Sequence, residues 1–246
     1  MIDSLYKKFQ HWSDGGSVWI ISDPHFEDED CLLMNPNWIS PDQYIENLNK
    51  KIHKGDTLIC LGDVGNIEWI RKIKASRKIL IKGNHDDKGD QYYIREIRRE
   101  IYDSKEYTPK QIREELMEKY PGYRIEISRE CYEFHSPFTR YYVYIDNMLF
   151  DEVYSGTLFI SDKILLSHEA IYGLPFCVNI HGHHHNGEHR YYDEYGCKHI
   201  NLAADVCNYE PINLGKEIKN GLFSDIPQIH RITIDGATER KNNGKF

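Results

Sequence analysis

The stretch SVWIISDPH, residues 17–25, joins an apolar run to a polar turn. The run is rich in β-branched residues, which predicts a buried strand that ends just before Asp23 and His25. Residues 41–53, PDQYIENLNKKIH, then carry apolar side chains at helical spacing, and TLICLGDVGN, residues 57–66, repeats the pattern of strand and polar turn. Strand, helix and strand in this order predict an α/β fold with at least partly parallel strands.

The same pattern returns three times along the chain, in RKILIKGNHDD (77–87), KILLSHEA (163–170) and FCVNIHGHHHNG (176–187). Each motif alone has an ordinary explanation, such as a turn, a helix cap or a solvated histidine-rich loop. Together, however, five successive strand ends each offer a carboxylate, an amide or an imidazole, and none offers a thiolate. The polar residues at these ends are Asp23, His25, Asp63, Asn84, His85, Asp86, His168 and the histidines 183–185.

The chemistry of this set favours a metal centre. Carboxylate, amide oxygen and imidazole suit manganese, iron, zinc or nickel, whereas structural zinc more often recruits cysteine. On an extended strand end, residues two apart face the same way, so Asp23 and His25 should reach one ion. By the same argument His183 and His185 should reach one site, while His184 points elsewhere. Without His85, Asp86 and His184, seven candidate ligands remain. Seven are too many for one ion but suit a dinuclear centre with ions about 3.5–4 Å apart.

Composition restricts the class of protein. The 246 residues are 40% apolar and 13% aromatic, as expected of a folded globular chain. The net charge of −8 disfavours a general affinity for nucleic acid or for anionic membranes. We expect no secretory signal and no membrane span, because no apolar run is long enough. Six cysteines without CxxC spacing predict reduced thiols in a cytoplasmic protein.

Residues 89–146 differ from the rest and predict an inserted α+β segment. Residues 90–102 place Ile94, Ile97 and Ile101 on one helical face, and a second helix should begin at Thr108, followed by strands over 123–128 and 140–145. The many tyrosines here either stack on a base or aryl group at the site or pack the segment's own core. The acidic run FEDED, residues 26–30, is interpreted as a solvated loop; facing the site, it would repel long polynucleotides.

In this order, SDPHF, LGDVGN, KGNHDD, LLSHEA and HGHHHN resemble the motifs D-x-H, G-D, G-N-H-D/E, a later His and G-H-x-H of the calcineurin-like metallophosphoesterases. The resemblance runs from about residue 17 to residue 205, interrupted by 89–146, and NLAADVCNYEP resembles the tail of small bacterial and phage-type members. It implies a single domain over 1–246, a two-sheet α/β/β/α sandwich with helices on both outer faces and with 89–146 inserted. That tail is expected equally to serve core packing, with capping by Asp205 or Asn208, or to take part in catalysis.

The resemblance also implies roles for the polar residues. Asp23, His25 and His185 would bind the first metal, Asn84, His168 and His183 the second, and Asp63 would bridge the two. His85 would lie beside the scissile phosphate as the catalytic residue, and Asp86 would orient it through a hydrogen bond. The expected cofactors are two divalent transition-metal ions, with manganese first and iron, zinc or nickel as alternatives.

The function predicted on this basis is metal-dependent hydrolysis of a small phosphodiester or phosphomonoester by a bridging hydroxide, with a slight preference for diesters. The expected partner is a small phosphate ester, with no membrane and no extended nucleic acid. One alternative is a non-catalytic scaffold of the same fold for protein interaction, although such relatives tend to lose ligands that are all filled here. The other is a nuclease, against which the absence of a basic stripe argues.

Overall fold

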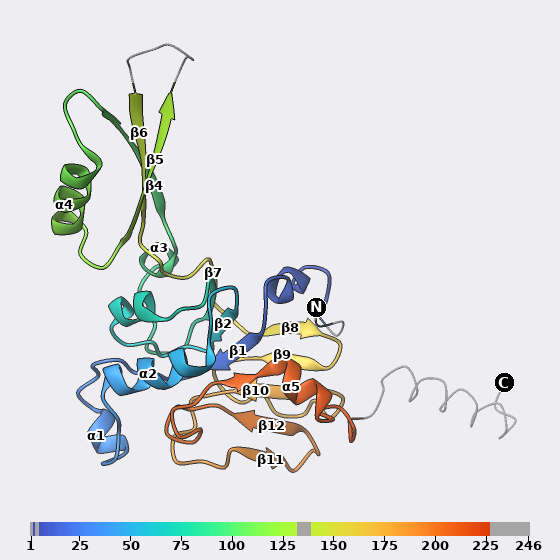
Figure 1. Ribbon diagram of the computed structural model, residues 1–246. Helices are drawn as coiled ribbons and strands as arrows, with labels where there is room; N and C mark the ends of the chain where they lie inside the picture. The colour runs from blue at the N-terminus through green and yellow to red at the C-terminus, as the bar shows by residue number, and fades with distance from the viewer. Residues whose placement is uncertain (1, 3–4, 132–138, 227–246) are drawn as a thin grey trace, which may run out of the picture.

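A computed structural model describes residues 2, 5–131 and 139–226, and it contains two five-stranded sheets and one three-stranded sheet (Figure 1). The first sheet has the order β13-β1-β2-β3-β7. Strands β1, β2, β3 and β7 run parallel, and β13 pairs antiparallel with β1. These strands are β1 (Val18–Ile21), β2 (Thr57–Cys60), β3 (Arg77–Ile81), β7 (Glu152–Tyr154) and β13 (Ile212–Asn213).

The second sheet has the order β11-β12-β10-β9-β8 and is parallel at its centre. Its edge strands β8 and β11 are antiparallel to their neighbours. The strands are β8 (Leu158–Ser161), β9 (Ile164–Leu166), β10 (Val178–His181), β11 (Arg190–Tyr192) and β12 (Lys198–Asn201). Alternate residues of both sheets meet in one apolar cluster that includes Ile20, Ile59, Ile79, Ile164, Ile180 and Ile200, all fully buried. The cluster joins the two sheets face to face.

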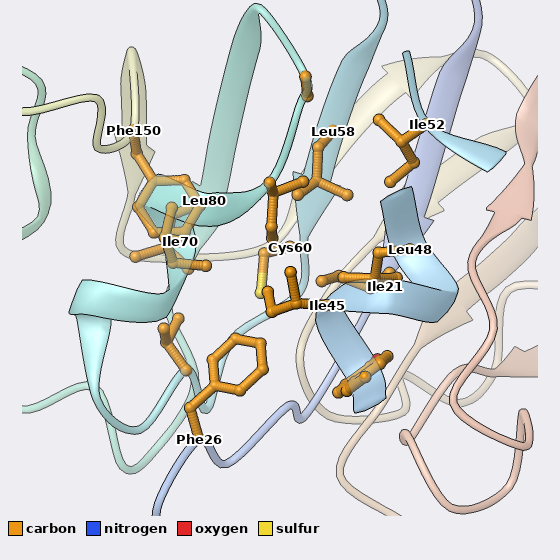
Figure 2. Packing of buried hydrophobic residues seen from close by; sticks show 14 of the residues in the cluster. Ile21, Phe26, Ile45, Leu48, Ile52, Leu58, Cys60, Ile70, Leu80 and Phe150 are labelled. Atoms are coloured by element: carbon orange, nitrogen blue, oxygen red, sulfur yellow. The ribbon is translucent and has the colours of Figure 1, made fainter. Parts of the chain in front are cut away.

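Helix α2 (Pro41–Lys51) and the 3-10 helix η2 (Ile67–Lys72) cover the outer face of the first sheet (Figure 1). Ser40 caps α2 by accepting the backbone N–H of Gln43, and Gln43 returns a bond to the Ser40 backbone. Figure 2 shows Ile45 and Leu48 of α2 against Leu58 and Cys60 of β2. This second apolar layer fixes the strands whose ends carry the polar motifs.

Four other helices, outside the segment 97–146, are short. They are η1 (Gln10–Ser13), α1 (Cys31–Met34), α3 (Asp90–Tyr93) and α5 (Leu214–Lys219). Helix α5 contacts β1 and β13, and its Glu217 pairs with Arg190 of β11, so it closes one edge of the sandwich. The described outer face of the second sheet is lined by polar side chains such as Asn179, His181 and His199 rather than by a helix.

Residues 97–131 and 139–146 form an antiparallel sheet of order β4-β6-β5, which projects away from the two larger sheets (Figure 1). Its strands are β4 (Ile97–Asp103), β5 (Arg124–Cys131) and β6 (Thr139–Asp146). Helix α4 (Pro109–Lys119) packs on it and begins with the capping box expected from Thr108 and Gln111. A small separate core forms from Ile112, Leu116, Ile125, Val143 and Ile145.

The helix predicted over residues 90–102 is wrong beyond its first turn. The chain forms α3 over Asp90–Tyr93 and then enters strand β4, which pairs with β6 along its whole length. Ile97 and Ile101, which were predicted to share one helical face, are 56% and 51% exposed. Pairing with residues 37 to 49 positions away, which local periodicity does not report, decides the conformation here.

The predicted α/β sandwich of two sheets is confirmed. The helix layer expected on the outer face of the second sheet is not found among the described residues, where polar side chains and loops lie instead. The structure describes the side chains of five cysteines, and all five are free thiols. Among the described residues, no helix combines the length and the apolar character that crossing a membrane requires.

Candidate metal centre

The polar side chains of the five motifs come together where parallel strands of the two packed sheets end. Asp23 and His25 follow β1, Asp63 follows β2, and Asn84 follows β3. The second sheet contributes His168 after β9, and His183 and His185 after β10. Parallel neighbours bring their carboxyl ends to the same edge of a sheet, and the face-to-face packing places the two edges side by side.

Asp23, His25 and His185 form a first group of potential ligands. One ligand atom from each lies within 4.8 Å of the other two. His185 Nε2 is 3.8 Å from Asp23 Oδ1, and the rings of His25 and His185 have their centroids 5.3 Å apart. These are the three residues that the resemblance implies for the first ion.

Asp63, His168 and His183 form a second group with the same spacing. His168 Nε2 is 3.2 Å from Asp63 Oδ2, 3.2 Å from His183 Nδ1 and 2.8 Å from Asn84 Oδ1. Two imidazole nitrogens and two oxygens are therefore gathered here, with the other three atoms each within 3.2 Å of His168 Nε2.

Asp63 lies between the two groups. Its Oδ2 is 3.7 Å from His25 Nε2 of the first group and 3.2 Å from His168 Nε2 of the second. Its Oδ1 accepts the backbone N–H of His85 at 2.9 Å, which fixes the carboxylate. This is the position that a bridging ligand requires.

The backbone at four of these residues is in the left-handed region that favours glycine. The φ angles are +52° at Asp23, +41° at His25, +52° at Asp63 and +65° at His183. Each such residue costs roughly 1–3 kcal/mol, and such conformations gather at functional sites. The assumption of extended strand ends was therefore wrong. As a consequence, His183 and His185 fall into different groups instead of reaching one site.

Two glycines of the motifs make room for the carboxylates. A Cβ on Gly182 would lie 2.0 Å from Asp23 Oδ2, and a Cβ on Gly83 would lie 2.2 Å from Asp63 Oδ1. Real Cβ atoms do not approach other atoms this closely. The G-H and G-N pairs in the sequence therefore reflect close approach of one loop to the ligand on another loop.

Two histidines of the first group are oriented by carboxylates that sequence reasoning did not assign to this role. His185 Nδ1 donates to Asp205 Oδ1 at 2.7 Å, and His25 Nδ1 donates to Asp28 Oδ2 at 3.0 Å. A proton on Nδ1 leaves Nε2 as the free lone pair, and the carboxylate raises its basicity. Asp28 stands three residues after His25, so a local signal existed. For the segment that contains Asp205, packing with capping and a catalytic role were equally expected, but not the orientation of His185.

The second group is oriented by the backbone. His168 Nδ1 donates to the carbonyl oxygen of Leu61 at 2.8 Å, which turns its Nε2 toward Asp63 and Asn84. His183 instead presents Nδ1 to the group. The side chain of His184 belongs to neither group, as expected, and its carbonyl accepts a bond from Asn201.

The buried charged groups of the centre shift one another's pKa values. Burial raises the pKa of Asp23. Burial opposes the charged form of His168, but hydrogen bonding to Asp63 and the charges of Asp23 and Asp63 outweigh it and raise the His168 pKa to about 9. Burial likewise opposes ionisation of Asp63, and the bond from His168 nevertheless lowers its pKa. An imidazolium–carboxylate pair thus occupies the second group, and a metal ion must displace its proton.

Asp86 has different partners from those expected. Its Oδ2 accepts the backbone N–H groups of Asp63 and Gly83, both at 2.8 Å, and its Oδ1 accepts that of Val64 at 3.1 Å. Both oxygens are therefore committed to the backbone, so Asp86 ties the loop after β2 to the loop after β3. It positions the segments that carry Asp63 and His85 rather than the His85 ring.

A cavity of about 380 Å³ adjoins the first group and contains His85 in its wall. The other lining residues include His25, Glu27, Asp28, Asn66, Asp87, Tyr92 and Tyr93. Glu27, which is exposed, and Asp28, which is half-buried, thus line the cavity, so this part of the acidic run is solvated and also faces the site. Tyr92 and Tyr93 of α3 also line it, whereas Tyr102, Tyr120, Tyr123 and Tyr141 pack around the small core of the inserted sheet.

The donor set fits two divalent transition-metal ions. Each group offers one carboxylate and two imidazoles, Asn84 adds an amide oxygen, and no thiolate takes part. Asp63 stands between the groups, as two ions sharing one ligand require.

Comparison with known protein families identifies the family of the chain. The family model described as calcineurin-like phosphoesterase matches residues 16–212. Among solved structures, a protein of unknown function, AQ665 from Aquifex aeolicus, is 22% identical, with 83% of this chain and 98% of that chain covered and a TM-score of 0.46. No curated protein matches the sequence significantly.

Proposed function

Because the chain belongs to the calcineurin-like phosphoesterase family, we propose that it hydrolyses small phosphate esters with two divalent metal ions, manganese being the first candidate. The observation that carries the proposal is the convergence of two Asp/His groups on Asp63, beside a cavity whose wall contains His85.

The proposed ligands divide as the geometry divides them. Asp23, His25 and His185 would hold one ion and Asn84, His168 and His183 the other, with Asp63 available to both. The two ions would supply positive charge to the phosphate oxygens and acidify the attacking water. The carboxylates Asp28 and Asp205 keep His25 and His185 in the tautomer that offers Nε2.

His85 is the proposed proton donor to the leaving oxygen. Its backbone N–H is fixed to Asp63, its ring centroid lies 5.5 Å from that of His25, and its side chain is exposed in the cavity. It belongs to neither ligand group, so its imidazole stays available for proton transfer.

The cavity supports a small substrate with little charge. Four carboxylates in its wall, those of Glu27, Asp28, Asp86 and Asp87, outnumber the one lysine, Lys88, so the wall repels polyanions. A diester carries fewer negative charges than a monoester. Tyr92 offers an exposed ring for an aromatic leaving group. These features favour a phosphodiester of small size over a long polynucleotide. The free thiols support a reducing compartment such as the cytoplasm.

The experiment is hydrolysis of a chromogenic phosphodiester and of the matching monoester by chelator-stripped protein, with and without added manganese. We expect turnover that depends on manganese and is faster with the diester. His85→Ala should abolish turnover while metal binding is retained, and His184→Ala, the matched control, should behave as wild type because its side chain belongs to neither ligand group.

Other outcomes would select the alternatives. If the protein binds two ions but hydrolyses neither ester, the non-catalytic scaffold becomes the preferred function. Cleavage of RNA or DNA in preference to both esters would favour a nuclease.

A further inference from the structure

A second cavity, of about 350 Å³, lies between the first sheet and the base of the inserted sheet. Its walls include Lys54 and Ser76, which precede β2 and β3, Lys78 at the start of β3, and Arg124 of the insertion. The metal groups lie at the opposite ends of the same parallel strands. This cavity is therefore separate from the candidate metal centre.

The charge of this cavity opposes that of the whole protein. Seven of its thirteen lining residues are lysine or arginine and one is acidic, whereas the full chain has a net charge of −8. The basic residues are Lys54, Arg71, Lys72, Lys74, Lys78, Arg95 and Arg124, and the acidic one is Asp151. Such a concentration of positive charge indicates an anionic ligand.

The three arginines already have carboxylate partners. Arg95 binds Asp146 with two nitrogens and Asp151 with a third, Arg124 shares Asp146, and Arg71 pairs with Glu68. Their charges are largely compensated, and they mainly fix the shape of the wall.

The four lysines are compensated less than the arginines, since among the described residues Lys72 alone of the four pairs with a carboxylate, and that carboxylate is exposed. Lys54 and Lys74 make no ion pair with any residue that the structure describes, and Lys72 lies over the ring of Trp69 and 3.6 Å from the exposed Asp42. Lys78 is 4% exposed and donates one of its three protons to the carbonyl of Met148 at 2.8 Å. Uncompensated positive charge thus remains around a concave space.

We propose that this cavity binds a small anion that carries two or more phosphate groups. A volume of about 350 Å³ is that of a small-molecule site and accommodates a diphosphate with or without an attached nucleoside. Lysine ammonium groups bind phosphate as point charges and need no fixed fork geometry. The cations surround a hollow rather than forming a stripe, which favours a small ligand over a nucleic-acid strand.

The test is calorimetric titration of the full chain, without added metal and at low ionic strength (~0.01 M, where screening is weak). Inorganic pyrophosphate, phosphate and a nucleoside diphosphate are compared. Pyrophosphate or the nucleoside diphosphate should bind with one site per chain and more tightly than phosphate; the tighter of the two shows whether a nucleoside is recognised. Lys54→Gln with Lys74→Gln should weaken binding about tenfold or more. Both side chains are exposed, so folding should persist.

The matched control is Lys50→Gln with Lys110→Gln, which removes the same charge from exposed sites elsewhere and should leave the affinity unchanged. His85→Ala should also bind as wild type, because the metal centre is not involved. Equal loss in both lysine pairs, loss in His85→Ala, or absence of binding would overturn the inference. Tighter binding of a short RNA than of pyrophosphate on the same lysines would overturn it as well.

Discussion

Replacing Asp205 with alanine should selectively weaken the first metal ion. Asp205 is nearly fully buried, holds the Nδ1–H of His185 at 2.7 Å and accepts the backbone N–H of Asn186 at 2.8 Å. A hydrogen bond to a charged group contributes about 1.5–3 kcal/mol. Loss of such a partner behind a metal-binding histidine costs about 10–100-fold in metal affinity, or about 1.4–2.7 kcal/mol. The two magnitudes agree.

The assay is calorimetric titration of manganese into chelator-stripped protein. Wild type should show two binding events, and Asp205→Ala should shift one of them by about 10–100-fold while the other is retained, since the second group does not contact Asp205. Asp205→Asn keeps an acceptor oxygen and should lose less. Asp162→Ala, an exposed aspartate in the turn between β8 and β9, is the control. Wild-type affinity for both ions in folded Asp205→Ala would refute the reasoning.

Three further predictions concern stability and protonation. Asp86→Ala leaves three backbone N–H groups without their acceptor and should lower the free energy of unfolding by about 3 kcal/mol or more, as measured by urea titration. The control Asp87→Ala, at the exposed neighbouring residue, should change it by less than about 0.5 kcal/mol. The pKa of metal-free His168 is about 9, and only neutral imidazole binds metal. Manganese affinity should therefore rise between pH ~7 and ~9, by up to about tenfold per pH unit, and calorimetry should detect proton release on binding. Binding that is independent of pH and releases no proton would contradict this. Burial lowers the pKa of Lys78 to about 8 in the folded state, so between pH 8 and ~10 the unfolded chain binds more protons than the folded chain. Over this range the free energy of unfolding of wild type should rise by about 1.4 kcal/mol per pH unit relative to that of Lys78→Met. The same pH dependence of stability in both proteins would show that this lysine is not desolvated.

Much of the sandwich was predictable because its signals are local. The apolar runs before Asp23, Asp63 and Asn84 became β1, β2 and β3, and Thr108 with Gln111 capped α4 as their spacing indicates. The segment over 90–102 was misjudged because β4 owes its conformation to β6, which lies far away in the sequence.

The candidate site was predictable in its membership but not in its geometry. The strand-end motifs supplied the residues of both groups, since carboxylates and histidines after parallel strands must converge. The left-handed backbone that separates His183 from His185 depends on the loops' packing, and the Asp205 bond joins residues twenty positions apart. Likewise, the net charge of −8 hides the basic cavity, whose lysines and arginines come from segments between residues 54 and 124.

The central claim is that hydrolysis requires two ions held around Asp63. The most direct measurement follows bound metal per chain and turnover of the chromogenic diester in the same manganese titration of stripped protein. We predict that turnover is absent without metal and reaches its maximum only as the second ion binds. Turnover by metal-free protein, full turnover with a single ion, or binding of fewer than two ions at saturation would contradict it.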